Sequence, residues 1–179
     1  AASLGTALVC AALAATNPPW WAVAAWWASR LLDGFDGPVA RARGQVSDLG
    51  GYLDMVGDTI GYAVIPLGVA AGVDSRGAWI AAAALVASFF VNAISWSYLA
   101  AVLEKRGHGA AATGEMTTIT MPPALVEGTE TIVLFSVFIA LPDAAMPTFW
   151  AMAALVTVNV VQRISWAARH LTDTSRRHP

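Results

Sequence analysis

Apolar runs of about the length of a membrane crossing recur along this chain, and short polar or Gly/Pro-containing breaks separate them. A hydrocarbon core of about 30 Å requires roughly 20 apolar residues in a helix. The pattern predicts six helical spans, at residues 1–16, 19–41, 48–72, 78–103, 121–142 and 147–169. The breaks contain Pro18, Gly44, Gly72 and Pro142, which stop helices for backbone reasons. We therefore expect an all-α integral membrane protein of six transmembrane helices, with residues 1–179 forming a single domain.

Composition agrees with a chain that lies in lipid. The sequence is 57% hydrophobic and only 12% charged, whereas a soluble domain carries about 25% charged residues. The strand-like alternation of a membrane barrel is not seen. The net charge of −2 says little about partners, and no basic tract with interleaved aromatic residues suggests nucleic acid. Cys10 is the single cysteine, so an internal disulfide is excluded and a buried small side chain is expected.

The basic residues predict how the chain is oriented. In the six-span arrangement one side of the membrane carries Arg41, Arg43, Lys105, Arg106, Arg169, Arg176 and Arg177, and the other carries Arg76. By the positive-inside rule the first side is cytoplasmic, which places both termini and the loop between spans two and three at the cytoplasmic face of the cell membrane. Four tryptophans of span two are expected to be anchors at the interface or facing lipid: Trp20, Trp21, Trp26 and Trp27.

Span two ends in an unusual polar stretch, which begins the segment DGFDGPVARARGQVSDLGGYLDMVGD (33–58). At about 100° per helical residue, five of its residues share an arc of about 140°. These residues are Asp33, Asp36, Gly37, Ala40 and Arg41. Two carboxylates and one guanidinium therefore lie on one face of a helix that is otherwise apolar.

Span three begins with a matching stripe. Gly50, Asp54 and Asp58 follow one another at i, i+4 and i+8, so they line one face of the helix. Two helices joined by a tight turn would bring the two acidic faces together at their cytoplasmic ends. We expect four carboxylates to converge on one pocket, bordered by small residues that let a ligand approach the backbone.

Carboxylates in surroundings of low dielectric remain ionised only when cations are near. Hard oxygen ligands favour Mg²⁺, Mn²⁺ or Ca²⁺, and no His or Cys lies near enough in sequence to suggest zinc. Proteins usually hold Mg²⁺ with few carboxylates plus substrate phosphates, so a phosphate or diphosphate substrate is implied. One ion or two would fit. A single intramembrane Asp is often a structural hydrogen bonder, but four on facing stripes favour a functional site. For Gly34, Gly51, Gly57 and Gly61 we expect a role in helix packing instead.

These residues resemble the signature of the CDP-alcohol phosphotransferase (CDP-alcohol phosphatidyltransferase) family, D-x2-D-G-x2-A-R-x8-G-x3-D-x3-D. The sequence fits all eight fixed positions without insertion, at Asp33, Asp36, Gly37, Ala40, Arg41, Gly50, Asp54 and Asp58. The motif covers 26 of 179 residues, and the six-span outline is also similar to that family. Members usually carry a juxtamembrane helix before span one. The chain does not begin with Met and shows no such helix, so we expect it to start inside or just before the first span.

The resemblance implies a reaction of phospholipid biosynthesis. CDP-diacylglycerol, or a related CDP-linked alcohol, would donate a phosphoalcohol group to an acceptor hydroxyl, and CMP would be released. The implied roles are metal binding by Asp33, Asp36, Asp54 and Asp58, with Asp58 also the general base, and contact with the CDP moiety by Gly37, Ala40, Arg41 and Gly50. The implied cofactor is Mg²⁺ or Mn²⁺, as one or two ions, and a homodimer is also plausible from the resemblance.

The acceptor alcohol is left open by the sequence. Glycerol 3-phosphate, inositol phosphate, serine and a phospholipid headgroup all remain candidates. Glu127 and Glu130 are spaced i, i+3 at the start of span five, where they either extend an acceptor pocket or favour the helix dipole. Arg163 in span six requires an anion, and an acidic side chain is expected before substrate phosphate. Cations for a charged acceptor would come from Arg30, Lys105, Arg106 and Arg163.

Two other classes of protein share some of these features. Membrane prenyltransferases also use aspartate-rich helices and Mg²⁺ to hold a diphosphate, but they carry two separate motifs on a longer chain. A cation channel or transporter with an acidic vestibule would need polar residues along a path through the outer half of the membrane as well. The outer half here is rich in Trp and Ala. Both readings remain alternatives to the phosphotransferase.

Overall fold

The computed structural model of the chain describes residues 2–16, 18–42, 47–107 and 128–172, except for the side chains of residues 2, 36–42 and 172. These residues form helices and no strand. The helices are α1 (Ala2–Thr16), α2 (Pro19–Ala42), α3 (Asp48–Val73), α4 (Arg76–Lys105), α6 (Gly128–Ala140) and α7 (Ala145–Thr172), with a short 3₁₀ turn, η1, at Pro142–Ala144. The expected all-α class is confirmed, and the helix limits lie close to the predicted spans.

Local side-chain chemistry sets the ends of the middle helices. Ser47 precedes α3 in an extended conformation, and its Oγ accepts from the backbone N–H of Gly50 at 3.1 Å. Asp74 ends α3 in the left-handed region, with φ of 48°, which turns the chain sharply. Ser75 then caps α4 by accepting from the N–H of Ala78 at 3.1 Å. A serine hydroxyl therefore accepts from one free backbone N–H in the first turn of each of these two helices.

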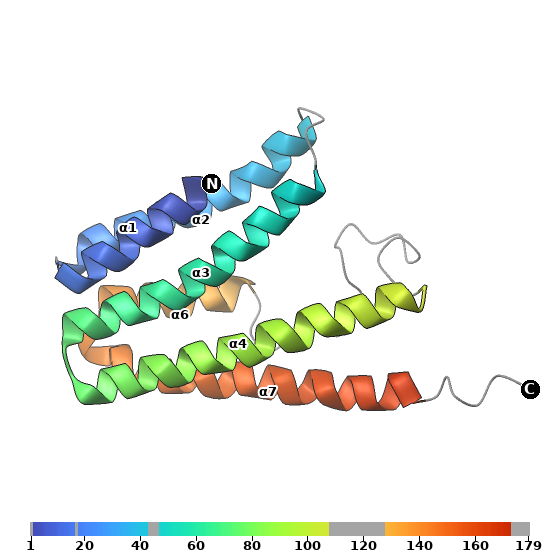
Figure 1. The fold of residues 1–179 in the computed structure, drawn as a ribbon. Coiled ribbons are helices and arrows are strands. Elements are labelled where there is room, and N and C mark those ends of the chain that lie inside the picture. Colours follow the sequence, from blue (N-terminus) through green and yellow to red (C-terminus); the bar gives the residue numbers. More distant parts are fainter. Residues whose placement is uncertain (1, 17, 43–46, 108–127, 173–179) are drawn as a thin grey trace, which may run out of the picture.

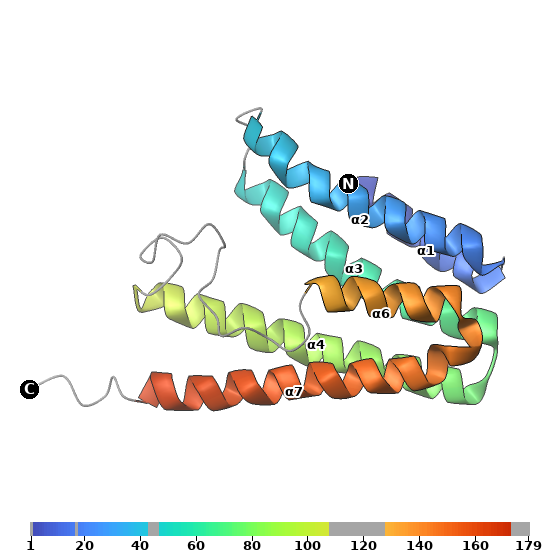
Figure 2. The same cartoon turned by 180° about the vertical axis from the view of Figure 1, so that it is seen from behind.

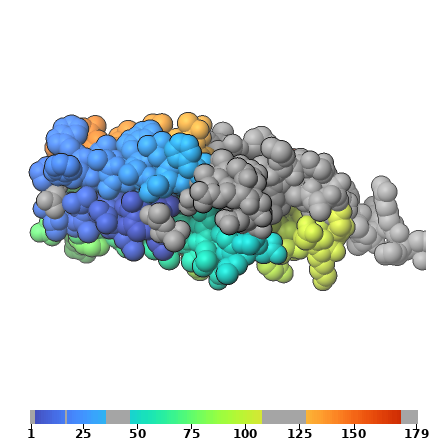
Figure 3. Space-filling model, turned by 90° about the horizontal axis from the view of Figure 1, so that it is seen from above, coloured from blue at the N-terminus to red at the C-terminus, as the bar shows by residue number. Residues whose placement is uncertain are grey.

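The helices run back and forth along one direction (Figure 1). The last turns of α2, α4 and α7 and the first turns of α3 point toward one end, and the α3–α4 turn and η1 lie at the other. α1 packs against both α2 and α3, and α4 packs along α7. Seen from behind, α6 lies between α2 and α7 and contacts both (Figure 2). α1 and α2 lie side by side on a further face, next to the first turns of α3 (Figure 3).

The basic residues follow this arrangement. Lys105 lies in the last turn of α4 and Arg169 in the last turn of α7, at the end where α2 leads toward α3. Arg76 begins α4 at the opposite end. The separation of basic residues that the sequence predicts is therefore present between the two ends of the molecule.

Three described helices are long and apolar enough to cross a membrane: α3, α4 and the segment Pro142–Leu171 that contains α7. Ser3–Thr16 and Gly128–Ala140 are apolar but shorter. α2 has 24 residues, but it carries four charged residues, Arg30, Asp33, Asp36 and Arg41. Length and composition thus support part of the predicted set of six spans, and the complete set stays a prediction.

Glycines allow α1 to approach the backbone of α3. A Cβ added at Gly68 would lie 2.3 Å from the carbonyl oxygen of Ala11, and one at Gly72 would lie 2.3 Å from that of Ala14. No side chain fits at such distances, so only glycine permits this contact. Small residues of this kind let helices pack closely in lipid, where van der Waals contact replaces the hydrophobic effect as the main attraction.

The glycines for which the sequence favoured a packing role divide into two pairs. Gly57 and Gly61 face α1, where an added Cβ would lie 3.6 Å from Leu4 and 3.3 Å from Ala7 respectively. Gly34 and Gly51 have nothing within 4 Å of an added Cβ. The packing role is confirmed for the first pair and is wrong for the second.

An aromatic cluster joins the helices in the core. The ring of Trp26 stacks on Phe135 with centroids 4.9 Å apart, and Phe135 contacts Phe138 at 4.7 Å and Tyr62 at 5.4 Å. Trp26 is fully buried, and its Nε1 donates to Ser136 Oγ at 3.1 Å. The cluster therefore fixes α2 against α6 and α3 immediately beside the polar segment of α2.

Burial corrects one expectation about the tryptophans. Trp20, Trp21 and Trp27 are exposed, as lipid-facing or interfacial side chains would be. Trp26 is instead a core residue, because the helix turns it toward Phe135 while its neighbours in sequence face outward. Cys10 is buried as predicted, and its Sγ lies 3.3 Å from the carbonyl oxygen of Ala22.

The glycine contact yields a prediction for stability. Gly68→Ala places a methyl group 2.3 Å from the Ala11 carbonyl oxygen, so α1 must move away from α3. We expect the free energy of unfolding to fall by about 1–3 kcal/mol, the usual cost of overpacking, as measured by unfolding in detergent. Gly5→Ala is the matched control, because nothing lies within 4 Å of its added Cβ. Equal stability of the two variants would contradict the close contact.

Candidate active site

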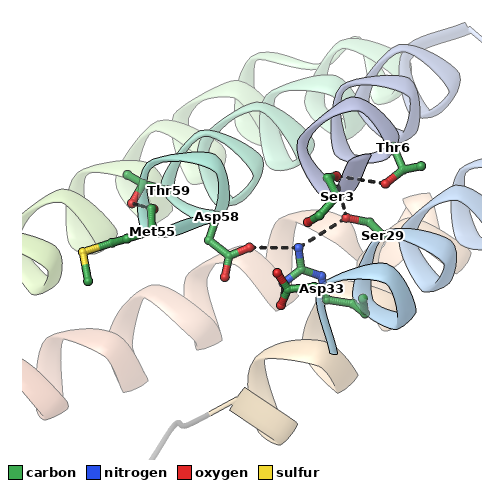
Figure 4. A network of polar contacts seen from close by, with 8 residues as sticks. Ser3, Thr6, Ser29, Asp33, Met55, Asp58 and Thr59 are labelled. Carbon is green, nitrogen blue, oxygen red and sulfur yellow. Dashed lines mark hydrogen bonds and ion pairs between the residues drawn. The ribbon is translucent and has the colours of Figure 1, made fainter. Parts of the chain in front are cut away.

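The acidic faces of α2 and α3 meet around the side chain of Arg30. Its Nη2 lies 3.1 Å from Asp58 Oδ1, and its Nη1 lies 3.5 Å from Asp33 Oδ2. The Arg30 side chain is only 7% exposed, and those of Asp33 and Asp58 are 24% and 28% exposed. Figure 4 shows Asp33 and Asp58 directed toward one another from the two helices. One buried guanidinium thus bridges two carboxylates on different helices.

The guanidinium is also enclosed by neutral groups. It lies 4.8 Å from the ring centroid of Trp26 and 5.7 Å from that of Tyr62, distances at which an aromatic face attracts a cation. Nη2 also donates to Ser29 Oγ at 3.3 Å, and Ser29 Oγ donates to the carbonyl oxygen of Ser3 at 3.0 Å. Aromatic faces and a hydrogen-bond chain therefore hold the cation against the first turn of α1.

α1 has a larger part in this site than the sequence suggests. A tight turn between α2 and α3 was expected to bring their acidic faces together, but the described parts of these helices do not pack along their length. α1 lies against both of them, and Ser3 in its first turn contacts Ser29 beside Arg30. The first turn of α1 therefore lies directly beside the acidic site, to which Ser3 is connected through Ser29.

Within the part of the chain that the structure describes, the bridge leaves two buried polar atoms without a hydrogen-bond partner, Asp33 Oδ1 and Arg30 Nε. Such atoms are uncommon and costly in folded proteins. Both Asp54 and Asp58 are close enough to act on Asp33 electrostatically, and Asp54 is exposed. Asp54 and Asp58 therefore add negative charge close to Asp33, whose Oδ1 is buried and has no partner among the described residues.

This donor set suits a hard divalent cation, because its ligands would be carboxylate oxygens and one of them, Asp33 Oδ1, has no hydrogen-bond partner among the described residues. With Arg30 between Asp33 and Asp58, no group of three or more described acids stands ready to share an ion. A fourth acid, Asp36, lies one turn beyond Asp33 on α2, outside the described side chains.

The other motif residues lie at the same end of the molecule. Four occupy the last turns of α2, where side chains are not described: Asp36, Gly37, Ala40 and Arg41. Gly50 lies in the first turn of α3, and a Cβ there would be 3.1 Å from Ser47 Oγ. Because that hydroxyl caps the N–H of Gly50, a side chain at this position would crowd the cap.

The part of the chain that the structure describes does not show the three candidates for an acceptor pocket, Glu127, Glu130 and Arg163, in one place. Glu127 lies outside them, and Glu130 is exposed in the first turn of α6. Arg163 extends from α7 to α4, where its Nη1 donates to Asn92 Oδ1 at 2.9 Å and to Ser95 Oγ at 3.0 Å. A cavity of about 240 Å³ with mainly apolar walls lies beside it.

The expectation of an acidic partner for Arg163 is not met, since the ion pairs between described residues are those of Arg30. An amide and a hydroxyl satisfy Arg163 instead. Both groups lie on α4, so these hydrogen bonds join α4 to α7.

Arg30 is the site residue that sequence reasoning missed, since it was considered only as one of several cations for an acceptor. The signal was available. A guanidinium in the apolar run WWASRLLD requires a counter-charge, and Asp33 follows it at i+3 on the same helix face. Asp58 as its second partner could not be inferred, because that contact depends on how α2 and α3 are spaced by α1.

Comparison with known proteins identifies the family. A model of the CDP-alcohol phosphatidyltransferase family matches residues 2–161. The chain therefore belongs to the CDP-alcohol phosphatidyltransferase family, whose members are transferases that use CDP-alcohol donors and alcohol acceptors in membranes and generally depend on divalent metal.

One curated relative is the inner membrane protein YnjF of Escherichia coli (strain K12), which is 35% identical over 107 residues. The matched region is 60% of this chain and 50% of the relative, so the chain spans about half the length of that protein. Its name, together with the family and the three long apolar helices, supports a membrane location for this chain.

The bridge between α2 and α3 yields a second prediction. Arg30→Ala and Asp58→Ala should each destabilise the protein, because each leaves a charge buried without its partner. The double variant should lose less than the sum, with a coupling energy of about 1–3 kcal/mol, measured by unfolding in detergent with EDTA. Asp48→Ala is the control in the same cycle, since Asp48 is exposed in the first turn of α3. Strictly additive losses for Arg30 and Asp58 would count against the bridge.

Proposed function

We propose that the chain transfers a phosphoalcohol group from a CDP-linked lipid alcohol, such as CDP-diacylglycerol, to an acceptor hydroxyl and releases CMP in phospholipid biosynthesis. The observation that carries this proposal is the meeting of Asp33 and Asp58 from two helices at Arg30, with Asp54 near enough to act on Asp33 electrostatically and with Asp33 Oδ1 buried and without a partner among the described residues. Membership of the family supports the same reaction class.

The carboxylates have two tasks in this reaction. Asp33, Asp36, Asp54 and Asp58 would hold Mg²⁺ or Mn²⁺, as one or two ions. Bound there, a divalent cation supplies positive charge that favours the negatively charged diphosphate and the departing CMP. Gly37, Ala40, Arg41 and Gly50 would border the CDP moiety, where three small residues leave room for the nucleotide and Arg41 is available to its phosphate oxygens.

Asp58 is proposed as the general base, and its partial exposure keeps it accessible to an acceptor. Its carboxylate accepts the proton of the acceptor hydroxyl as the oxygen attacks the phosphorus that carries the lipid alcohol. A new P–O bond forms, the P–O bond to CMP breaks, and CMP leaves with the bonding electrons. The product is a phosphodiester, and Asp58 returns its proton to solvent.

The acceptor is proposed only as a small or lipid alcohol. Glu127, Glu130 and Arg163 stay candidates for its pocket, although Arg163 is held by α4 in this structure. We also propose that all six helices span the cell membrane with the acidic site at the cytoplasmic face. The basic residues at that end of α4 and α7 support this orientation. A homodimer is proposed from the family alone.

Product analysis tests the function directly. The purified protein, CDP-diacylglycerol and Mn²⁺ are mixed with a panel of alcohols, and we expect CMP to appear together with a new phospholipid for at least one of them. EDTA should abolish both products. Release of pyrophosphate from a prenyl diphosphate would instead indicate a prenyltransferase, and ion flux into vesicles without CMP would indicate a channel or transporter.

Two conservative variants separate catalysis from binding. Asp58→Asn should abolish turnover but leave binding of the CDP donor largely intact, because the amide cannot accept the acceptor proton. Asp36→Asn should weaken donor binding that depends on Mg²⁺, as measured by calorimetry with and without the ion. Equal loss of turnover and donor binding in Asp58→Asn would refute the role of Asp58 as a base.

A further inference from the structure

We propose that Arg30 is a built-in counter-cation of the acidic site, which holds Asp33 and Asp58 while no divalent cation is bound and releases them when one binds. The inference rests on the proposed function, since it concerns the same carboxylates and the metal that the family generally requires. It assigns to Arg30 a role in regulating access of the cation, although Arg30 is not part of the eight-residue motif.

The argument begins with the position of the charge. The guanidinium nitrogens lie 3.1 Å and 3.5 Å from oxygens of Asp58 and Asp33, the groups that would bind a divalent cation. Two cations cannot share those oxygens without strong repulsion, and repulsion is poorly screened where the Arg30 side chain is 7% exposed. Binding of the metal and bridging by Arg30 therefore compete.

The surroundings of Arg30 allow it to release the carboxylates without leaving its place. Trp26, Tyr62 and Ser29 contact the guanidinium without charge, and they would remain in place beside it after the ion pairs break. A small shift of the side-chain tip is sufficient for the exchange. The two aromatic rings and the Ser29 hydroxyl would thus continue to stabilise the Arg30 guanidinium after its ion pairs with the two aspartates are broken.

The bridged arrangement is also incomplete in a specific way. It leaves one buried acceptor, Asp33 Oδ1, and one buried donor, Arg30 Nε, to which no described residue is hydrogen-bonded. A divalent cation at Asp33 would satisfy the first, and a phosphate oxygen of the donor would suit the second. Release would also free Asp58 Oδ1, which the bridge occupies and which the proposed base needs.

The opposite role for Arg30 makes the opposite prediction. If the guanidinium only positioned the carboxylates for metal, its removal would weaken metal binding, because the ligands would be less ordered. If it competes, removal tightens metal binding. The direction of the change therefore decides between the two roles.

Calorimetry of Mn²⁺ binding to the detergent-solubilised full chain tests the inference without an activity assay. Arg30→Gln should lower the Kd for Mn²⁺ by on the order of tenfold, because a cation adjacent to the ligands is gone. Arg163→Gln is the matched control. It removes a second partly buried guanidinium, whose described partners are Asn92 and Ser95, and should leave the Kd unchanged. An unchanged or higher Kd in Arg30→Gln would overturn the inference.

Arg30→Lys keeps the proposal testable if the Gln variant does not fold. A single ammonium has no planar fork with which to bridge both carboxylates, so the Kd for Mn²⁺ should again fall, but by less. In EDTA the Gln variant should unfold at a lower temperature than the wild type, and Mn²⁺ should raise its Tm by more than it raises that of the wild type. Equal shifts would overturn the inference.

The outcomes separate this inference from the proposed function. If the wild type binds Mn²⁺ but the Arg30 variants bind it no more tightly, only the inference fails. If the wild type and both Arg30 variants bind no Mn²⁺, the metal-dependent function fails, and the inference fails with it.

Discussion

A charge in apolar surroundings requires a counter-charge, and this constraint organises the site. α2 carries Arg30 and Asp33 next to a fully buried tryptophan, in a segment whose neighbours are mostly apolar. The cost of burying these ions falls when opposite charges lie within contact distance. The pairing of Arg30 with Asp33 and Asp58 meets this requirement across two helices, and it brings the acidic residues of α2 and α3 into one place.

The rest of the structure supports that pairing. α1 lies against both α2 and α3 and provides Ser3 to the hydrogen-bond chain that ends at Arg30. The aromatic cluster presents Trp26 and Tyr62 to the guanidinium. The charges that pair in this structure are those proposed to hold the cation, so stability and the proposed function involve one set of side chains.

Much of this architecture could be predicted from the sequence. The apolar runs gave the helices to within a few residues, because Pro, Gly and Ser at the breaks act locally. The spacing of Asp54 and Asp58 predicted that they lie on one face of α3, because helical geometry alone determines which residues of a helix share a face. The positions of Gly57 and Gly61 at a helix contact followed from their size.

What could not be predicted depends on how whole helices are placed. The burial of Trp26 and the partners of Arg30 and Arg163 follow from which helix lies beside which, and a single sequence does not contain that information. α1 between α2 and α3 is the main example. The sequence of α1 is mostly apolar and gives no sign of a connection with the acidic site. In the structure, however, Ser3 in its first turn accepts a hydrogen bond from Ser29 beside that site.

The close contact of α1 with α3 has a consequence for the acidic end of the molecule. Backbone touches backbone at Gly68 and Gly72, so α1 cannot slide along α3 without a steric clash. The position of Ser3 along α3 therefore depends on the contacts that Ala11 and Ala14 make near the other end of α1. A substitution that displaces α1 at Ala11 or Ala14 would therefore also displace Ser3, which lies beside Arg30 and its aspartates.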